Sequence, residues 1–281
     1  MKKVIKNIWK TINFPLMYIG VQMIISFVYS FVVGVVLGVK MGLSGEILQA
    51  EDLTNEIMLL SDTRILIIIS ACVTLLIVFL RVRKELNAEN FWSFSKIKAL
   101  PMIVCAVFGI ALNMLMVGVL TFIPMRQQSV INNMIGDNFI LEIVSIALLT
   151  PILEEIIFRG IVLKRLSKMM KLPIAIFLQS LIFAIVHFDP VQSVCSFILG
   201  IVLGLVYIWF DSIWFAVVFH IMYNITSITI LHIAGNAEVK IIYFLIMTVI
   251  AIVVTIFSII ILGKINSKKE TVIITDGKSN V

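Results

Sequence analysis

The chain has 281 residues, of which 61% are hydrophobic and only 14% are charged. Soluble domains contain about 45–50% apolar and about 25% charged residues. The mean hydropathy is +1.13 and the net charge is +6. These values exclude a disordered chain, a coiled coil and a nucleic-acid-binding domain. They predict an all-α polytopic membrane protein with no nucleic-acid partner.

Eight apolar runs are long enough to cross a bilayer as helices, since one span needs about 20 mostly apolar residues. They cover residues 15–39, 64–80, 99–123, 138–158, 172–188, 191–209, 212–233 and 241–263. We expect one membrane domain because no internal repeat is visible. Residues 1–137 contain the first three helices and an acidic outer loop. Residues 138–235 form a core of helices four to seven, and residues 236–281 contain the last helix and a basic tail.

The distribution of positive charge predicts the orientation. Eighteen of the 22 Lys and Arg residues precede the first run or follow the second, fourth and eighth runs. Excess Lys and Arg mark the cytoplasmic side. We therefore expect both termini in the cytoplasm and the acidic loop 41–63 outside. A composition rich in Lys and Ile is typical of a low-GC bacterium, so the expected location is a bacterial plasma membrane.

Two glycine pairs indicate close helix contacts. They are Gly34 with Gly38 and Gly200 with Gly204. Glycines spaced in this way let helix backbones approach each other where lipid supplies no hydrophobic drive. We expect both pairs to pack within the molecule.

Polar groups at membrane depth are costly unless they are paired or hydrated, so each marks a candidate site. The first is the segment Glu154-Glu155-Ile-Ile-Phe-Arg159, late in the fourth run. Glu155 and Arg159 have the favourable i,i+4 spacing for an ion pair. Glu154 then lacks a local partner and suits a general base. The alternative is a helix end at the cytoplasmic interface, with both acids ionised and balanced by the basic residues that follow.

Histidines carry two further motifs. His187 closes the fifth run, four residues after Phe183, and a lone membrane histidine could also be a packing residue. His220 and Asn224 lie four residues apart on one face of the seventh run. An imidazole and an amide in this arrangement could bind a metal, orient a water or stabilise an oxyanion. His232 fits neither pattern and receives no role.

Together these motifs contain the parts of a hydrolase. One carboxylate could activate a water, one histidine could position it, and the His220–Asn224 pair could stabilise the tetrahedral oxyanion. A glutamate with two histidines, here Glu154, His187 and His220, is also a zinc ligand set with one open position. The residues leave both chemistries open. The HExxH and GxSxG motifs are absent.

The three motifs resemble those of the CPBP family of intramembrane proteases. This family includes the CAAX-processing endopeptidase and bacterial bacteriocin-processing and self-immunity proteins. The motifs here read Glu154-Glu155-x-x-x-Arg159, Phe183-x-x-x-His187 and His220-x-x-x-Asn224. The resemblance is strongest over about residues 138–235. It implies an eight-helix fold and cleavage of a peptide bond near a membrane.

The resemblance also implies a role for each motif residue. Glu154 looks like the water-activating glutamate, His187 like the residue that helps to hold the water, and His220 and Asn224 like the oxyanion stabilisers. The supporting residues would be Glu155, Arg159 and Phe183. Members have been described both as metalloproteases and as metal-independent glutamate proteases, so a zinc cofactor stays open.

The leading hypothesis is an endopeptidase acting on a membrane-associated peptide or protein, such as a bacteriocin or pheromone precursor or a CAAX-like protein. A prenylated substrate is not expected, because bacteria generally lack protein prenylation. The alternative is a non-enzymatic binding or immunity protein of the same fold, in which Glu154 is dispensable. A transporter would require repeats or discontinuous helices with midplane charges. The expected partners are the substrate and the lipid bilayer, and the oligomeric state stays open.

These assignments create one geometric difficulty. In a plain serpentine arrangement, Glu154 and His220 lie about 8 and about 12 Å from the cytoplasmic face, at 1.5 Å per residue. His187 lies about 22 Å from that face. For the three side chains to meet, the fifth helix must tilt or begin outside the bilayer.

Overall fold

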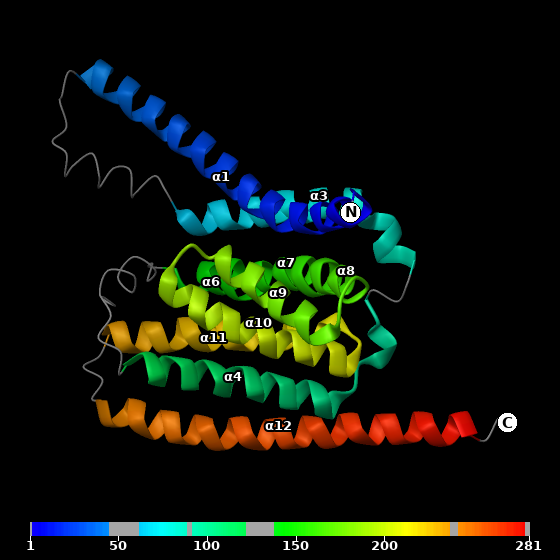
Figure 1. Ribbon diagram of the computed structural model, residues 1–281. Helices are drawn as coiled ribbons and strands as arrows, with labels where there is room; N and C mark the ends of the chain where they lie inside the picture. The colour runs from blue at the N-terminus through cyan, green and yellow to red at the C-terminus, as the bar shows by residue number, and fades with distance from the viewer. Residues whose placement is uncertain (1, 45–61, 89–91, 122–137, 237–240, 279–281) are drawn as a thin grey trace.

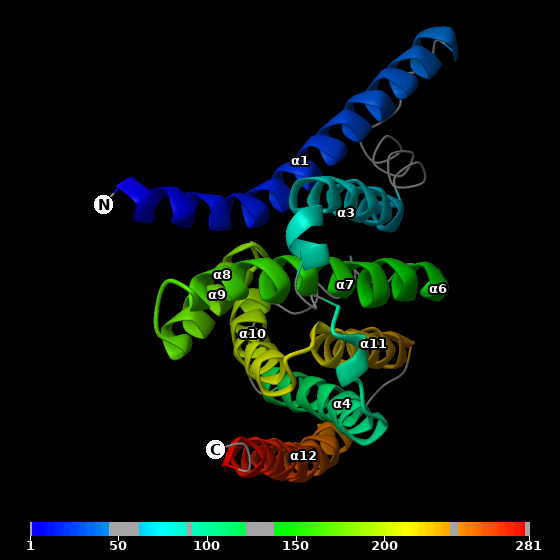
Figure 2. The ribbon, with the colours of Figure 1, turned by 90° about the vertical axis from the view of Figure 1, so that its right-hand side faces the viewer.

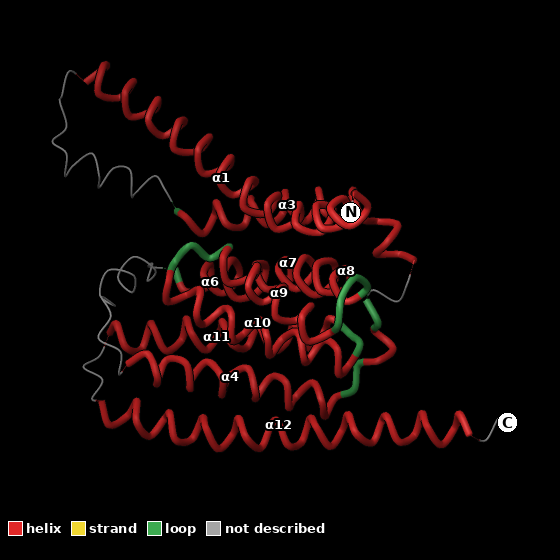
Figure 3. Tube along the Cα trace, viewed as in Figure 1, coloured by secondary structure: helices red, strands yellow, loops and turns green. Residues whose placement is uncertain are grey.

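The computed structural model describes residues 2–44, 62–88, 92–121, 138–236 and 241–278 (Figure 1). Most of the predicted outer loop 41–63 lies outside these residues. Within the described residues every regular element is helical and no strand is present (Figure 3). The all-α prediction is therefore confirmed.

Eight helical segments within the described residues match the eight predicted runs. They are α1 (Lys2–Ser44), α3 (Thr63–Ala88), α4 (Ala99–Thr121), a continuous helix over 139–167, α9 (Leu172–Ile185), α10 (Pro190–Phe210), α11 (Ile213–Asn236) and α12 (Ile241–Lys278). One short 3-10 turn, η1 (Phe94–Lys96), precedes α4. Six of these helices are long and apolar enough to cross a membrane, which confirms a polytopic membrane protein.

The helices stack in layers (Figures 1 and 2). α1 and α3 lie side by side on one face, and the helix over 139–167 lies beneath them together with α9. α10 and α11 follow, and α4 packs between α11 and the outermost helix α12. Both chain ends lie at the same end of the bundle, as an even number of spans predicts. Apolar side chains on α12 point outward, for example Val249 and Phe257.

The fourth helix is longer than predicted. It consists of α6 (Phe139–Glu142), η2 (Ile143–Leu149), α7 (Thr150–Glu155), η3 (Ile156–Leu163) and α8 (Lys164–Ser167). The predicted end at residue 158 is wrong, because Arg159 is buried inside the bundle and does not mark an interface. η2 and η3 are π-helical, a geometry that occurs mostly as short bulges inside α-helices and frequently at functional sites. α7, which carries both glutamates, lies between them.

Glycines allow the close contact between α9 and α10. A Cβ added at Gly200 would lie 2.9 Å from the Cβ of Ser180, and one at Gly204 would lie 3.3 Å from Ile176. Internal packing is therefore confirmed for this pair. It is wrong for Gly34 and Gly38, which have no described atom within 4 Å of an added Cβ. The reason is that this part of α1 diverges from the bundle (Figure 1).

The turn between α9 and α10 is tight. The Asp189 side chain caps α10 by accepting from the backbone N–H of Gln192, at 2.7 Å, and Pro190 occupies the first helical turn. Phe188 has a φ of 55°, in the left-handed region, which reverses the chain within a few residues. His187 is thereby held on a short connection between two packed helices.

Candidate active site

Glu155 accepts two hydrogen bonds on one carboxylate oxygen. Arg159 Nη1 lies 2.7 Å from Glu155 Oε1, and His220 Nδ1 lies 2.8 Å from the same atom. All three side chains are buried. The i,i+4 ion pair expected from the sequence is present, and it extends to an imidazole on α11. Because a carboxylate accepts, the proton of this histidine contact belongs to Nδ1.

Glu154 lies beside this network and is 5% exposed. Its Oε1 accepts a hydrogen bond of 3.2 Å from the Tyr18 hydroxyl on α1. Its Oε2 lies 3.8 Å from His220 Nε2, which is too long for a direct hydrogen bond but allows both groups to contact one water. The interfacial alternative for Glu154 and Glu155 is wrong, because both carboxylates are enclosed by other helices.

Phe183 lies between the two histidines of the motifs. Its ring centroid is 4.9 Å from that of His187 and 6.0 Å from that of His220, with nearly perpendicular planes. The Arg159 guanidinium carbon lies 4.8 Å from the same ring centroid, within the range of a cation–π contact. Phe183 therefore fixes the relative positions of two imidazoles and the buried cation.

The backbone sets the tautomer of His187. Its Nδ1 lies 2.7 Å from the carbonyl oxygen of Phe183. A carbonyl only accepts, so Nδ1 carries the hydrogen and the neutral ring keeps Nε2 as an acceptor. An acceptor at this position can hold one hydrogen of a water molecule.

The longer fourth helix removes the difficulty over depth. Ser180 packs on Gly200, and Arg159 Nη2 donates to the Gly200 carbonyl at 3.3 Å. These three residues therefore lie at about the same depth along the helix bundle. The chain reverses between α8 and α9. At about 1.5 Å per residue, His187 lies roughly 10 Å beyond this level along α9. Glu154 lies roughly 8 Å beyond it in the same direction along α7.

Asn224 is engaged by the backbone of the fourth helix. Its Nδ2 donates to the carbonyl of Ile146 at 3.0 Å. Ile146 lies in the π-helical stretch η2, and the contact holds α11 against it. An amide nitrogen has two hydrogens, so one remains for another acceptor.

The three residues that the sequence left open as zinc ligands do not form a recognisable metal-ligand group. Among the described residues, no group of three or more His, Cys, Asp or Glu side chains could hold a metal ion. The Glu155 oxygen nearest to His220 is already bonded to Arg159. In this arrangement the donor set of Glu154, His187 and His220 does not fit a zinc ion.

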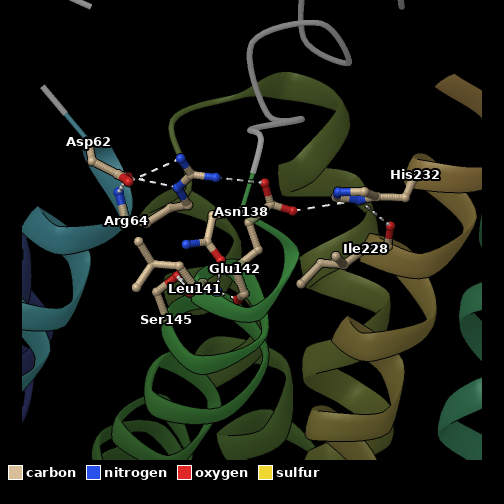
Figure 4. Close-up of polar contacts among 8 residues, drawn as sticks. All are labelled: Asp62, Arg64, Asn138, Leu141, Glu142, Ser145, Ile228 and His232. Carbon is tan, nitrogen blue, oxygen red and sulfur yellow. Dashed lines mark hydrogen bonds and ion pairs between the residues drawn. The ribbon is translucent and has the colours of Figure 1, made fainter. Parts of the chain in front are cut away.

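A second polar cluster lies at the other end of the bundle (Figure 4). Glu142 on α6 lies 3.2 Å from Arg64 Nη1 on α3 and 3.6 Å from His232 Nδ1 on α11. Asp62 is 2.7 Å from Arg64 Nε, and hydrogen bonds from Arg64 hold the pKa of Asp62 below its usual range. His232, which received no role from the sequence, thus belongs to a contact among three helices.

The sequence reasoning missed Tyr18 and the Ile146 carbonyl. The carbonyl left no signal, because every residue has one. Tyr18 and Gln22 did leave a signal, since they are polar, lie inside the first apolar run and are four residues apart.

The fold defines a polytopic membrane protein that encloses a buried cluster of glutamates and histidines inside its helix bundle. Residues 136–226 match the family model described as type II CAAX prenyl endopeptidase Rce1-like. The matched residues contain all three motifs, which confirms the resemblance drawn from them. No curated protein and no solved structure matches the chain. At the level of the family, the match supports a CAAX-type protease embedded in the membrane.

Proposed function

We propose that the protein is an endopeptidase that hydrolyses a peptide bond with a water activated by Glu154. The observation that carries this proposal is a buried carboxylate facing the imidazole of His220. That imidazole is held in turn by Glu155, as the carboxylate of a catalytic triad holds its histidine. The match to a protease family over residues 136–226 supports the same reaction class.

The reaction proceeds in two proton transfers. Glu154 takes a proton from the water while His187 Nε2 accepts its other hydrogen, and the resulting hydroxide attacks the peptide carbonyl. His220, whose Nδ1 is held by Glu155, stabilises the oxyanion together with the second amide hydrogen of Asn224. When the C–N bond breaks, Glu154 returns its proton to the leaving amine. No step requires a metal ion.

The substrate is a membrane-associated peptide or protein of the bacteriocin-precursor, pheromone-precursor or CAAX-like kind. Because the site lies inside a membrane bundle, such a substrate reaches it from the lipid or from the membrane surface. The protein acts in the bacterial plasma membrane, with both termini in the cytoplasm.

Cleavage of a peptide panel by the purified protein in lipid nanodiscs tests this function. The panel contains a leader peptide encoded beside the gene and a CAAX peptide with and without a farnesyl group. Wild type is compared with Glu154→Gln, each with and without a zinc chelator. Glu142→Gln is the matched control, because it also neutralises a carboxylate in the bundle that is 2% exposed.

We expect wild type and Glu142→Gln to cleave one peptide of the panel, and Glu154→Gln to lose at least about 100-fold in rate. The chelator should have no effect. Cleavage that survives Glu154→Gln would overturn the assigned base. Loss of activity with chelator and recovery with zinc would replace the mechanism by a metal-dependent one. If no peptide is cleaved and cells with Glu154→Gln keep wild-type immunity, the non-enzymatic alternative replaces the proposal.

A further inference from the structure

Tyr18 joins the N-terminal helix to the candidate active site. It lies on α1, outside the residues that match the protease family model, and 136 residues before Glu154. Its side chain is 6% exposed, and its hydroxyl donates to Glu154 Oε1 at 3.2 Å. Among the residues that the structure describes, no other side chain donates a hydrogen bond to this carboxylate within 3.5 Å.

The direction of the Tyr18 proton follows from the nature of its partner. A tyrosine hydroxyl has one hydrogen to donate and can accept on its oxygen. An ionised carboxylate only accepts, so the hydroxyl hydrogen in this contact points to Glu154 Oε1.

The part of α1 that carries Tyr18 packs against the core of the helix bundle. Arg165 on α8 donates to the carbonyl of Lys10 at 2.6 Å, and its guanidinium carbon lies 5.0 Å from the ring centroid of Phe14. Beyond Gln22 most side chains of α1 are exposed, with Val33 and Leu37 as exceptions, and the helix leaves the bundle (Figures 1 and 2). Tyr18 therefore lies on the last part of α1 that packs against the core.

We propose that Tyr18 is a positioning residue for the hydrolysis, acting through Glu154. By binding Oε1, its hydroxyl fixes the rotation of the carboxylate so that Oε2 faces His220 and the reacting water. The same hydrogen bond stabilises the ionised carboxylate, which is the form that accepts a proton from water. This inference rests on the proposed function and extends the site to a helix that the family match does not cover.

Tyr18→Phe tests this role, because it removes one oxygen and keeps the packing of the ring. The assay uses the panel peptide that wild type cleaves in nanodiscs, over a range of pH. We expect kcat to fall about tenfold, as for the loss of a hydrogen bond to a charged group, with KM within twofold. The low-pH limb of the kcat profile should move about one pH unit higher, since the carboxylate has lost a donor that stabilises its charge.

Two further variants separate positioning from packing. Tyr243→Phe, at a position on α12 that is 61% exposed, should leave both kcat and the pH profile unchanged. Gln22→Leu replaces a polar side chain one turn further along α1 and keeps the Tyr18 hydroxyl, so it should move the pH profile much less than Tyr18→Phe. A Tyr18→Phe protein with an unchanged pH profile would overturn the inference, whatever its thermal stability.

The failure of this inference is distinguishable from failure of the proposed function. If Glu154→Gln abolishes cleavage and Tyr18→Phe behaves as wild type, only the role of Tyr18 is wrong. If Glu154→Gln still cleaves, the assigned base is wrong, and the role of Tyr18 is overturned with it.

Discussion

His220 and Glu155 share a buried hydrogen bond of 2.8 Å although they are 65 residues apart in the chain. In the proposed mechanism, this contact gives the two adjacent glutamates separate roles. Neighbouring helix positions point about 100° apart, so Glu155 and Glu154 reach different partners. Glu155 binds the Nδ1 side of the imidazole, and Glu154 faces its Nε2 side at 3.8 Å.

Removing only Arg159 should reduce the stability of the protein more than replacing both Glu155 and Arg159 by uncharged residues. Arg159→Met leaves a buried carboxylate without its cation, which we expect to cost about 3–5 kcal/mol of stability. Combining it with Glu155→Gln removes both charges and should restore most of that loss. The double variant should still fail to cleave, because His220 has lost its carboxylate. Thermal unfolding in detergent measures the stability, and a peptide cleavage assay measures the activity. Equal stability of the single and double variants would contradict the argument.

His187→Gln and His187→Asn should show which nitrogen of the His187 imidazole is needed for cleavage. The amide group of Gln reaches the place of Nε2, whereas that of Asn reaches the place of Nδ1 and keeps the contact with Phe183. If Nε2 holds the water, His187→Gln should retain about 1–10% of wild-type kcat and His187→Asn less than about 0.1%. Steady-state cleavage rates decide this, and the reverse order would show that anchoring to Phe183 is the essential function of His187.

Replacing single glycines by alanine should show how strongly stability and cleavage depend on the close contact between α9 and α10. In Gly200→Ala, the new Cβ meets the Ser180 backbone at 3.0 Å, so α9 must move away from α10. We expect a loss of about 1–3 kcal/mol of stability and at least tenfold lower cleavage. Gly204→Ala, with contacts of 3.3–3.4 Å, should be milder. Gly34→Ala is the control and should be neutral or slightly stabilising, because nothing described lies within 4 Å.

The polar cluster of Arg64, Glu142 and His232 should support the fold and not the chemistry. Arg64→Gln, Glu142→Gln and the double variant form a thermodynamic cycle, in which we expect a coupling of about 1 kcal/mol. Cleavage should stay within twofold of wild type, since Glu142 lies about 18 Å from Glu154 along the fourth helix. Additive effects on unfolding would show that the ion pair seen in Figure 4 contributes nothing.

The contribution of Asp62, which contacts Arg64 in this cluster, to protein stability should decrease as the pH falls. Arg64 lowers the pKa of Asp62 in the folded protein, so this contact adds stability above the ordinary pKa of about 4. The contribution is lost as the pH falls through the lowered value. Asp62→Asn should therefore reduce the midpoint of thermal unfolding at pH 7 and have no effect at pH 2; an equal reduction at both values would contradict the electrostatic origin.

Local sequence was sufficient to predict the class of protein, the eight helical segments within the described residues and most of their limits. These properties depend on local hydrophobicity, and a bilayer demands about 20 apolar residues per span wherever the helix packs. The Glu155–Arg159 pair was also predictable, because i,i+4 side chains meet on any helix. The three motifs were sufficient to indicate a protease-like site within the region that the family model matches.

Which of these polar groups come into contact depends on the packing of helices that are distant in the chain. The partners of Glu154 come from α1 and α11, and no local periodicity links Tyr18 to His220. The end of the fourth helix was mispredicted because Arg159 finds its counter-charge inside the bundle. The glycine pairs at 34 and 200 have the same spacing but opposite packing. In each case the outcome depends on how helices distant in the chain pack together, which local sequence does not specify.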